Sequence, residues 1–366
     1  MKFNLHQSNL LEALNAVQGV VGSRPTLPVL SNVLIEAEGE TLTFTTTDFT
    51  ITKRWTCKAE IDEPGATTLP VKRLTSIVRE LSDQIVTISC DSGEQTDLVR
   101  MSCGSYHSKI TGISPKEFPA IPNTDKGLAY TLDQAVLKGM IRKTAYAAAT
   151  DDSRPVLTGL LLSFADGKLT CVATDGRRLA LCWAEAEFPP ENAKDVVLAP
   201  RTVAELLRSL GDEGPLKVTL KDTQVIFEFG EMFFSSKLLN GVYPNYKQVV
   251  FSDCDNKIRV NREELIATLR RINVSTTPTT NAMRLVFENN LLTVQVTAPD
   301  VDEATDTVTV KYDGPALTTI FNPEYVLEPL RNLTSDEVTI ELNNSSSPGL
   351  IKDDTTFLYV IMPLRV

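Results

Sequence analysis

Three stretches of the chain share one pattern of apolar and polar positions. Each opens with a short alternating segment and continues into apolar residues spaced three and four positions apart. The alternation predicts a strand, and the wider spacing predicts an amphipathic helix. An Asn, Asp or Ser at the joint suits the start of a helix. The stretches begin at Phe3, Tyr130 and Ile258, so the pattern returns after about 127 residues.

The match between the copies continues through two blocks rich in β-branched residues with period-2 alternation. Such blocks predict paired antiparallel strands. The first of these blocks spans 39–51, 167–179 and 290–299 in the three copies. The second spans 85–110, 216–238 and 338–362.

Between those two blocks, each copy has a strand followed by a helix. These segments run over 67–81, 197–210 and 320–333. Pro70, Pro200 and Pro323 stand at or just before the helix start, where the missing N–H of proline costs nothing.

Each copy therefore contains a strand, a helix, strands, a second helix and further strands. Two helices on antiparallel strands make an α+β domain. We expect three tandem copies at 1–122, 128–250 and 257–366, joined by linkers at about 117–127 and 242–256. Solenoid repeats are only about 20–50 residues long, so a period this long indicates whole domains in a row.

The composition is that of a soluble globular protein, with 42% apolar and 23% charged residues in 366. No apolar run is long enough to span a membrane, and the first residues do not resemble a signal peptide. The six cysteines form no C-x-x-C pair, and there are two histidines. We therefore expect a cytoplasmic protein with reduced thiols, no metal and no cofactor.

The net charge of −11 argues against nucleic-acid binding when it is taken as an average. The six predicted helices are less acidic than the rest of the chain. Their windows are 8–20, 71–82, 132–148, 200–210, 261–273 and 322–333. They hold 12 Lys and Arg against eight Asp and Glu, a net +4, which leaves −15 for the remainder. Two interpretations stay open: phosphate contacts by the helices, or ordinary helix-forming residues on a solvated face.

Several strings in the correct order make the whole chain resemble the bacterial DNA polymerase sliding clamps, the beta subunits of the replicative polymerase. These strings occupy 24–30, 63–70, 172–180, 236–246 and 362–366. The resemblance implies a head-to-tail homodimer that closes a ring around double-stranded DNA, with the helices lining the hole. It also implies a non-catalytic processivity factor that tethers the replicative DNA polymerase, the clamp loader and other proteins through a linear motif.

The resemblance suggests DNA contacts at Arg24, Lys72, Arg73 and Arg154. The helical pattern alone adds further basic residues to this predicted DNA surface: Arg79, Lys138, Arg142, Arg201 and Arg208. The first helix carries Glu12 and no Lys or Arg, so we expect it to hold DNA weakly.

The resemblance also implies an apolar cleft for partner peptides between the second and third copies. Carried over by position, its walls are Leu157, Thr174, Gly176, Arg177, Arg178, Leu179, Pro244, Val249, Tyr325, Ser346, Pro348, Val360, Met362, Pro363, Leu364 and Arg365. Without the resemblance, Asp175-Gly176 would be an ordinary hairpin turn. The implied dimer contact joins His107 and Ile110 of one chain to Ile272 and Val274 of the other.

Two other classes of function compete with a clamp. A hydrolase or transferase would place its carboxylates in one copy only, at 151–152, at 300–306 or at 353–354. The phosphate-loop, nucleophile-elbow and zinc-protease motifs are missing from the sequence. A structural array of three β-rich modules would not bind DNA at all. A dimeric mass, and retention on circular but not linear DNA, would favour the clamp.

Overall fold

The computed structural model describes most of the chain. The described residues are 1–22, 25–91, 96–121, 127–151, 153–250, 254–275, 282–297, 303–353 and 356–364. None of the helices in these ranges is long and apolar enough to cross a membrane.

The described residues contain a helix in each of the six predicted windows. These helices are α1 Gln7–Gln18, α2 Val71–Glu80, α3 Gln134–Thr144, α4 Pro200–Ser209, α5 Arg262–Asn273 and α6 Pro323–Asn332. Capping agrees with the sequence at two of the starts, where the side chains of Asn261 and Asn322 accept from the backbone N–H of Glu264 and Glu324.

Strands fill the remaining blocks of each copy. Copy one has β1 Lys2–His6, β2 Asn32–Glu38, β3 Thr41–Thr47, β4 Ile51–Lys58, β5 Glu60–Glu63, β6 Gly65–Pro70, β7 Ile85–Asp91, β8 Thr96–Cys103 and β9 Tyr106–Ile113. Copy two has β10 Leu128–Asp133, β11 Leu160–Ala165, β12 Lys168–Thr174, β13 Arg178–Glu185, β14 Lys194–Leu198, β15 Pro215–Leu220, β16 Gln224–Phe229 and β17 Met232–Lys237. Copy three has β18 Asn256–Asn261, β19 Met283–Glu288, β20 Leu291–Thr297, β21 Glu303–Lys311, β22 Leu317–Phe321, β23 Glu337–Leu342, β24 Gly349–Lys352 and β25 Phe357–Ile361.

Sequence patterning missed β2 and β5 in copy one, β11 in copy two, and β19 and β21 in copy three, and it reached only the first residues of β4 and β13. Strands β2 and β11 begin with consecutive buried residues, such as Val33, Leu34 and Ile35 in β2. A strand buried on both faces gives no alternation, so the period-2 signal is lost.

The chain folds as two compact units. The first contains 1–135 and 204–238, and the second contains 136–203 and 239–366. Each unit has one antiparallel sheet, ordered β10-β15-β16-β17-β4-β3-β2-β6-β9-β8-β7-β1-β5 in the first and β14-β11-β12-β13-β25-β24-β23-β18-β21-β20-β19-β22 in the second. Copy two therefore contributes strands to both units.

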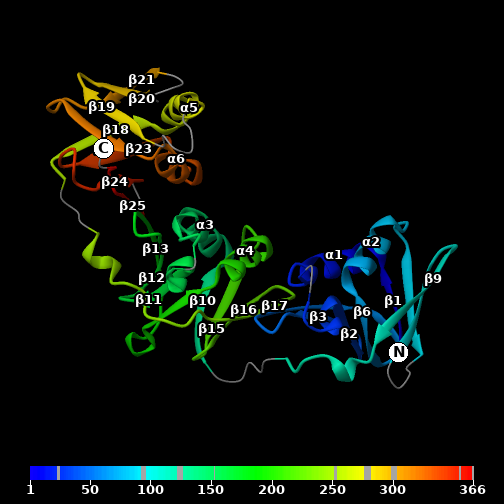
Figure 1. The fold of residues 1–366 in the computed structure, drawn as a ribbon. Helices are drawn as coiled ribbons and strands as arrows, with labels where there is room; N and C mark the ends of the chain where they lie inside the picture. Colours follow the sequence, from blue (N-terminus) through cyan, green and yellow to red (C-terminus); the bar gives the residue numbers. More distant parts are fainter. Residues whose placement is uncertain are drawn as a thin grey trace. The chain divides into compact units, whose positions relative to one another are not determined.

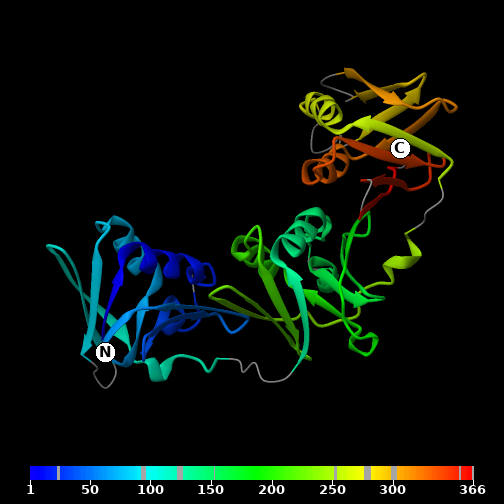
Figure 2. The ribbon, with the colours of Figure 1, turned by 180° about the vertical axis from the view of Figure 1, so that it is seen from behind.

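Adjacent copies are joined by strand pairing within each unit. In the first unit β17 of copy two pairs with β4 of copy one, from Met232↔Trp55 to Ser236↔Ile51. In the second unit β25 of copy three pairs with β13 of copy two, from Arg178↔Ile361 to Cys182↔Phe357. Figures 1 and 2 show the strands and helices of each unit. The last strand of a copy thus extends the sheet of the copy before it.

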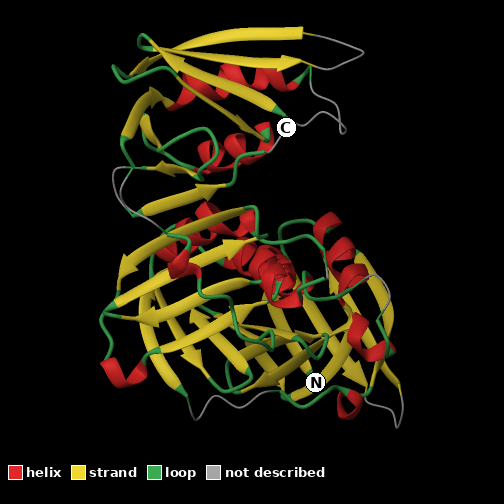
Figure 3. Ribbon diagram, turned by 60° about the vertical axis from the view of Figure 1, so that its left-hand side comes forward, coloured by secondary structure: helices red, strands yellow, loops and turns green. Residues whose placement is uncertain are grey.

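Helices cover one face of each sheet. In copy one, α1 and α2 lie side by side, and Leu14 of α1 and Val78 of α2 are fully buried in a core shared with Phe44. In copy three, α5 and α6 pack together in the same way, burying Leu269 and Leu330. The helices lie against the strands in Figure 3. The buried three-four spacing is the reason that these segments are helices at all.

Candidate functional sites

The β12–β13 hairpin ends in a turn built by two side chains. Asp175 Oδ1 accepts from the N–H groups of Arg177 and Arg178 at 2.8 and 3.0 Å. Thr174 Oγ1 accepts from the N–H of Gly176 at 3.1 Å and donates to the carbonyl of Arg178 at 2.6 Å. Gly176 has φ of 86°, a conformation that favours glycine. The turn therefore holds Gly176 and Arg177 exposed at the surface.

Arg178 is buried beneath this turn, with its side chain 8% exposed. Its guanidinium donates to Asp175 Oδ2 at 3.1 Å, to the Tyr146 carbonyl at 2.8 Å and to Glu328 of α6. It also lies 4.3 Å from the centroid of the Tyr325 ring. Such a fork of charge-assisted hydrogen bonds fixes geometry as well as adding stability.

A polar cavity of about 500 Å³ opens beside the turn. Its lining comprises Ala148, Ala149, Thr150, Asp151, Arg154, Asp175, Gly176, Arg177, Arg178 and Tyr325. Arg154 Nη2 donates to the Asp175 carbonyl at 3.3 Å. Arg154, predicted on DNA, therefore shares this cavity with four residues of the predicted peptide cleft.

An apolar surface continues from the turn along β25 and the segment after it. Leu179 and Val360 are register partners and belong to one buried cluster. After the strand, Met362 is 46% exposed and Leu364 is 38% exposed. Val249 is 50% exposed. The N–H of Met362 donates to the Arg177 carbonyl at 2.9 Å. Exposed apolar residues beside a backbone whose N–H group is already hydrogen-bonded are suited to anchoring a peptide.

All fifteen described residues of the predicted cleft lie in the second unit. Leu157, Arg178, Leu179 and Val360 are buried, so they support the surface from below. The remaining members are exposed or half-buried: Thr174, Gly176, Arg177, Pro244, Val249, Tyr325, Ser346, Pro348, Met362, Pro363 and Leu364. Arg365 lies outside the described residues.

The predicted DNA-binding residues lie mostly on exposed helix positions. Lys72, Arg73 and Arg79 of α2, Arg142 of α3, and Arg201 and Arg208 of α4 are exposed, and Lys138 of α3 is half-buried. Arg24 lies outside the described residues. Lys143 of α3 differs from these because it pairs with Asp353 at 3.0 Å and is 19% exposed. Position on a helix therefore does not by itself make a basic residue available to phosphate.

Sequence reasoning missed a buried ionic cluster in the first unit. Lys53 Nζ of β4 donates to Glu205 Oε2 of α4 at 2.7 Å, and the two side chains are 3% and 4% exposed. Arg208 makes a second ion pair with the same carboxylate. Burial lowers the pKa of Lys53, and the hydrogen bond that Lys53 donates to Glu205 opposes that shift. Both residues line a cavity of about 820 Å³ beside α1.

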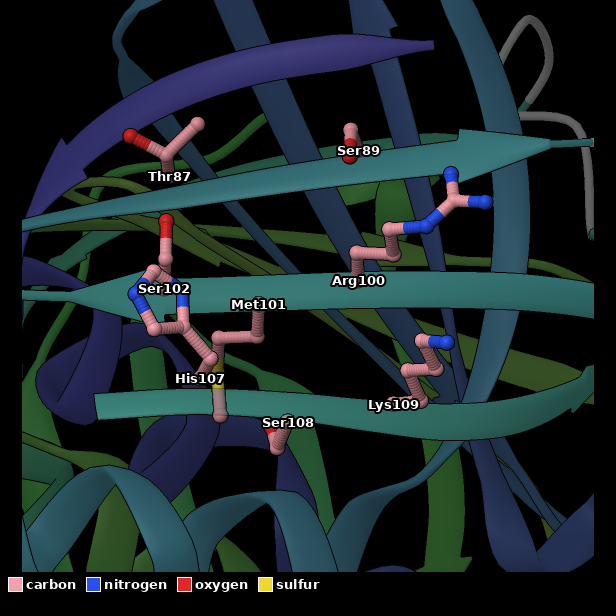
Figure 4. Close-up of a pocket in the computed structure, with 8 residues that line it drawn as sticks. All are labelled: Thr87, Ser89, Arg100, Met101, Ser102, His107, Ser108 and Lys109. Atoms are coloured by element: carbon pink, nitrogen blue, oxygen red, sulfur yellow. The ribbon is translucent and has the colours of Figure 1, made fainter. Parts of the chain in front are cut away.

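The residues predicted at the dimer contact divide into two kinds. His107 is exposed in a cavity of about 580 Å³ over β7, β8 and β9. His107 of β9 lies opposite Ser102 of β8 in the strand register, and Lys109 lies opposite Arg100 (Figure 4). Val274 is 84% exposed at the end of α5. Ile110 and Ile272 are each 2% exposed, so their side chains offer little surface to a partner, and their place at the dimer contact stays a prediction.

The acidic clusters considered for an enzyme are only partly described. Asp152, Asp300, Asp302 and Asp354 lie outside the described residues. Asp306 accepts from Arg271 at 2.6 Å, and Asp353 accepts from Lys143. In the described ranges no three His, Cys, Asp or Glu residues are grouped to hold a metal ion.

Comparisons with known proteins agree along the whole chain. Models of the DNA polymerase III beta subunit match as N-terminal domain at 1–122, central domain at 131–245 and C-terminal domain at 247–365. The beta sliding clamp of Chlamydia muridarum is 32% identical over 366 residues, covering 100% of this chain and 99% of that protein.

Solved structures give the same result. The DNA polymerase III subunit beta from Pseudomonas aeruginosa matches with a TM-score of 0.94 and 32% identity, covering 100% of both chains. A second structure of that sliding clamp, bound to griselimycin, matches equally well over 100% of both chains, with a TM-score of 0.94 and 32% identity. The chain therefore belongs to the DNA polymerase III beta subunit family. The predicted fold of three tandem clamp domains is confirmed.

Proposed function

We propose that this chain is a sliding clamp of chromosomal replication. Two copies form a ring around duplex DNA and tether the replicative polymerase and other partners that carry a clamp-binding motif. The ring performs no catalysis. It converts repeated binding into permanent attachment, because the DNA is enclosed and cannot diffuse away.

The pairing of strands between copies carries this proposal. Copy two gives β17 to β4 of copy one, and copy three gives β25 to β13 of copy two. The strand of copy one that corresponds to β17 and β25 is β9, and the strand of copy three that corresponds to β4 and β13 is β21. Neither pairs with another copy within the described part of the chain. In the described residues, β6 meets β9 at the single pair Thr68↔Ile113, and β18 meets β21 only at Arg259↔Lys311 and Val260↔Val310.

The open edges of β9 and β21 correspond to the two kinds of strand that pair between copies inside the chain. By the rule that joins the copies, β9 of one chain pairs with β21 of a second copy, and the reverse pairing completes a head-to-tail dimer. A heterologous contact that closes makes a ring and leaves no exposed edge.

We further propose that the exposed basic residues on α2, α3 and α4 face the enclosed DNA. Contacts from Lys and Arg to phosphate carry no sequence information and exchange rapidly with salt ions. Such contacts allow sliding. The net −15 outside the predicted helices repels DNA from the other surfaces of the ring.

The partner site in this proposal is the apolar surface around Met362 and Leu364, beside the Gly176 turn. Its exposed apolar side chains suit the hydrophobic anchors of a flexible peptide. A relative in the same family has been solved with griselimycin bound, which provides a probe for this surface.

The location and domain limits complete the proposal. None of the six cysteines, all of them described, forms a disulfide, and burial raises the pKa of the Cys57 thiol to about 11. Reduced thiols of low reactivity suit the reducing cytoplasm. We propose domain limits at 1–122, 128–250 and 257–366.

The decisive experiment is retention on DNA of different topology. We expect the protein, loaded onto nicked circular plasmid by a clamp loader, to coelute with the plasmid in gel filtration. Cutting the circle once should release it, because an open end lets the ring slide off. Equal retention on circular and linear DNA would contradict enclosure and favour ordinary binding.

A further inference from the structure

Arg178 connects three separate segments of the second unit. Its donors reach Asp175 in the β12–β13 turn, the Tyr146 carbonyl after α3 and Glu328 on α6 of copy three. One face of the guanidinium lies against the Tyr325 ring of α6, at 4.3 Å from the ring centroid. With its side chain 8% exposed, Arg178 presents little surface to a ligand.

Hydrogen bonds connect the Arg178–Glu328 contact to the exposed residue Met362. Arg178 and Asp175 fix the turn, since Asp175 also accepts from the N–H of Arg177 at 2.8 Å. The carbonyl of Arg177 accepts from the N–H of Met362 at 2.9 Å. A continuous chain of hydrogen bonds therefore runs from α6 through Arg178 and the turn to Met362.

A second link between α6 and the same surface runs beside the first. Tyr359 of β25 donates its hydroxyl to the Tyr325 carbonyl at 2.8 Å. Val360 follows Tyr359 and packs under the apolar surface. Helix α6 is thus tied to both sides of the proposed peptide site, although Glu328 does not line the polar cavity there.

We propose that Glu328 is a positioning residue for peptide binding. Acting through Arg178, its carboxylate holds the Gly176 turn and Met362 in the arrangement that receives the apolar anchors of a peptide. This inference rests on the proposed function of the cleft. A surface held in its binding conformation avoids the entropic cost of ordering when the ligand arrives.

The test compares two substitutions one turn apart on α6. Glu328→Gln removes the charge that holds Arg178. Glu324→Gln is the matched control, because Glu324 pairs with Arg331 at 3.1 Å and accepts from Asn273 at 2.9 Å, and neither partner belongs to the turn. Binding of griselimycin to the full-length dimer is measured by titration calorimetry. We expect Glu328→Gln to weaken binding about tenfold and Glu324→Gln to leave it unchanged, since only Glu328→Gln loses a charge-assisted hydrogen bond to Arg178.

Two further readouts separate positioning from general loss of structure. Glu328→Asp keeps the charge and should restore binding to within about threefold of the wild type. Hydrogen exchange of the Arg177 and Met362 amides should accelerate in Glu328→Gln and not in Glu324→Gln, while both variants unfold at the same temperature.

Other outcomes overturn the proposal. If Glu328→Gln binds griselimycin as tightly as the wild type while Met362→Ala binds it weakly, the cleft stands and the positioning role is wrong. If Met362→Ala also binds normally, the cleft assignment fails together with the inference built on it.

Discussion

Gly19 follows α1, and its backbone gives no reason for glycine. Its φ of −61° is open to any residue. The reason is space: a Cβ at Gly19 would lie 2.3 Å from Glu205 Oε2. That oxygen cannot move freely, because Lys53 holds it at 2.7 Å in a buried pair. Gly19 is therefore required by the ionic cluster that links α4 to β4.

We predict that Gly19→Ala lowers the free energy of unfolding by about 2 kcal/mol, because the new methyl group overpacks the site and displaces a buried carboxylate. Urea denaturation measures the loss. The control is Gly22→Ala, since a Cβ there meets nothing within 4 Å. Equal stabilities for the two variants would show that Glu205 moves aside without cost.

A second residue-scale prediction concerns the peptide site. Met362→Ala should weaken griselimycin binding about tenfold and leave the dimer intact, since the side chain is 46% exposed and contributes little to the core. Calorimetry and light scattering check the two parts. Leu179→Ala is a poorer test, because Leu179 is 3% exposed and its loss would also open a cavity.

Phe49→Ala is the matched control for Met362→Ala. Phe49 is 48% exposed in the turn after β3, the counterpart in copy one of the Gly176 turn. The backbone frame is the same, because Lys237 donates to the Thr50 carbonyl at 2.9 Å as Met362 donates to Arg177. If Phe49→Ala weakened griselimycin binding as much as Met362→Ala, the peptide would be using the junction of copies one and two.

At the scale of elements, the helices differ in the charge they can offer to DNA. Helix α2 exposes Lys72 and Arg73 on its first turn. Helix α3 exposes Arg142, but its neighbour Lys143 is committed to Asp353. The opposite roles of adjacent residues follow from the helical turn of about 100° per residue, which points them in different directions.

We predict that the double variant Lys72→Ala/Arg73→Ala shortens residence on nicked circular plasmid and lowers the slope of log affinity against log salt by about 1 to 2. Gel filtration at several salt concentrations measures both. Lys143→Ala also removes a positive charge from a helix and should not change the slope. A common effect in both variants would mean that only overall charge matters.

At the scale of the whole molecule, the proposed assembly depends on the open edges of β9 and β21. α5 packs on β21, and Arg271 donates to Asp306 of that strand at 2.6 Å. Val274 lies just past α5 and is 84% exposed. An apolar side chain this exposed, next to an unpaired strand edge, is expected at an interface between copies.

We predict that the wild type has a mass near twice 40.3 kDa by light scattering and that Val274→Glu reduces it to the mass of one chain. A buried charge at the interface is costly, whereas the monomer fold tolerates it at an exposed site. Val242→Glu is the control, because Val242 is 93% exposed outside the predicted interface. A dimeric Val274→Glu would remove Val274 from the interface.

Periodicity located the helices and most strands because each of these elements buries one face. Burial of one face requires apolar residues at a regular spacing along the sequence. The failures have the same origin. The strands β2 and β11 begin with runs buried on both faces, so alternation was absent. The sequence analysis did not single out Lys53, because its partner Glu205 lies 152 residues away.

The sites were predictable to different degrees. The turn at Gly176 follows from Asp175-Gly176 alone, but its connection to α6 depends on Glu328, distant in sequence. Ile110 and Ile272 were assigned to the dimer contact because they match by position, and in the single chain both side chains are buried. Burial depends on what packs above a residue, and no local pattern records that.

The sequence by itself determined three copies of one α+β module and the identity of its helices, because repetition and amphipathic spacing are local properties of the chain. Only the tertiary structure decided which strands pair between copies, which edges stay open and which charges are buried. Those outcomes depend on contacts between residues more than a hundred positions apart. The open edges at β9 and β21 are therefore the feature on which the proposed ring depends.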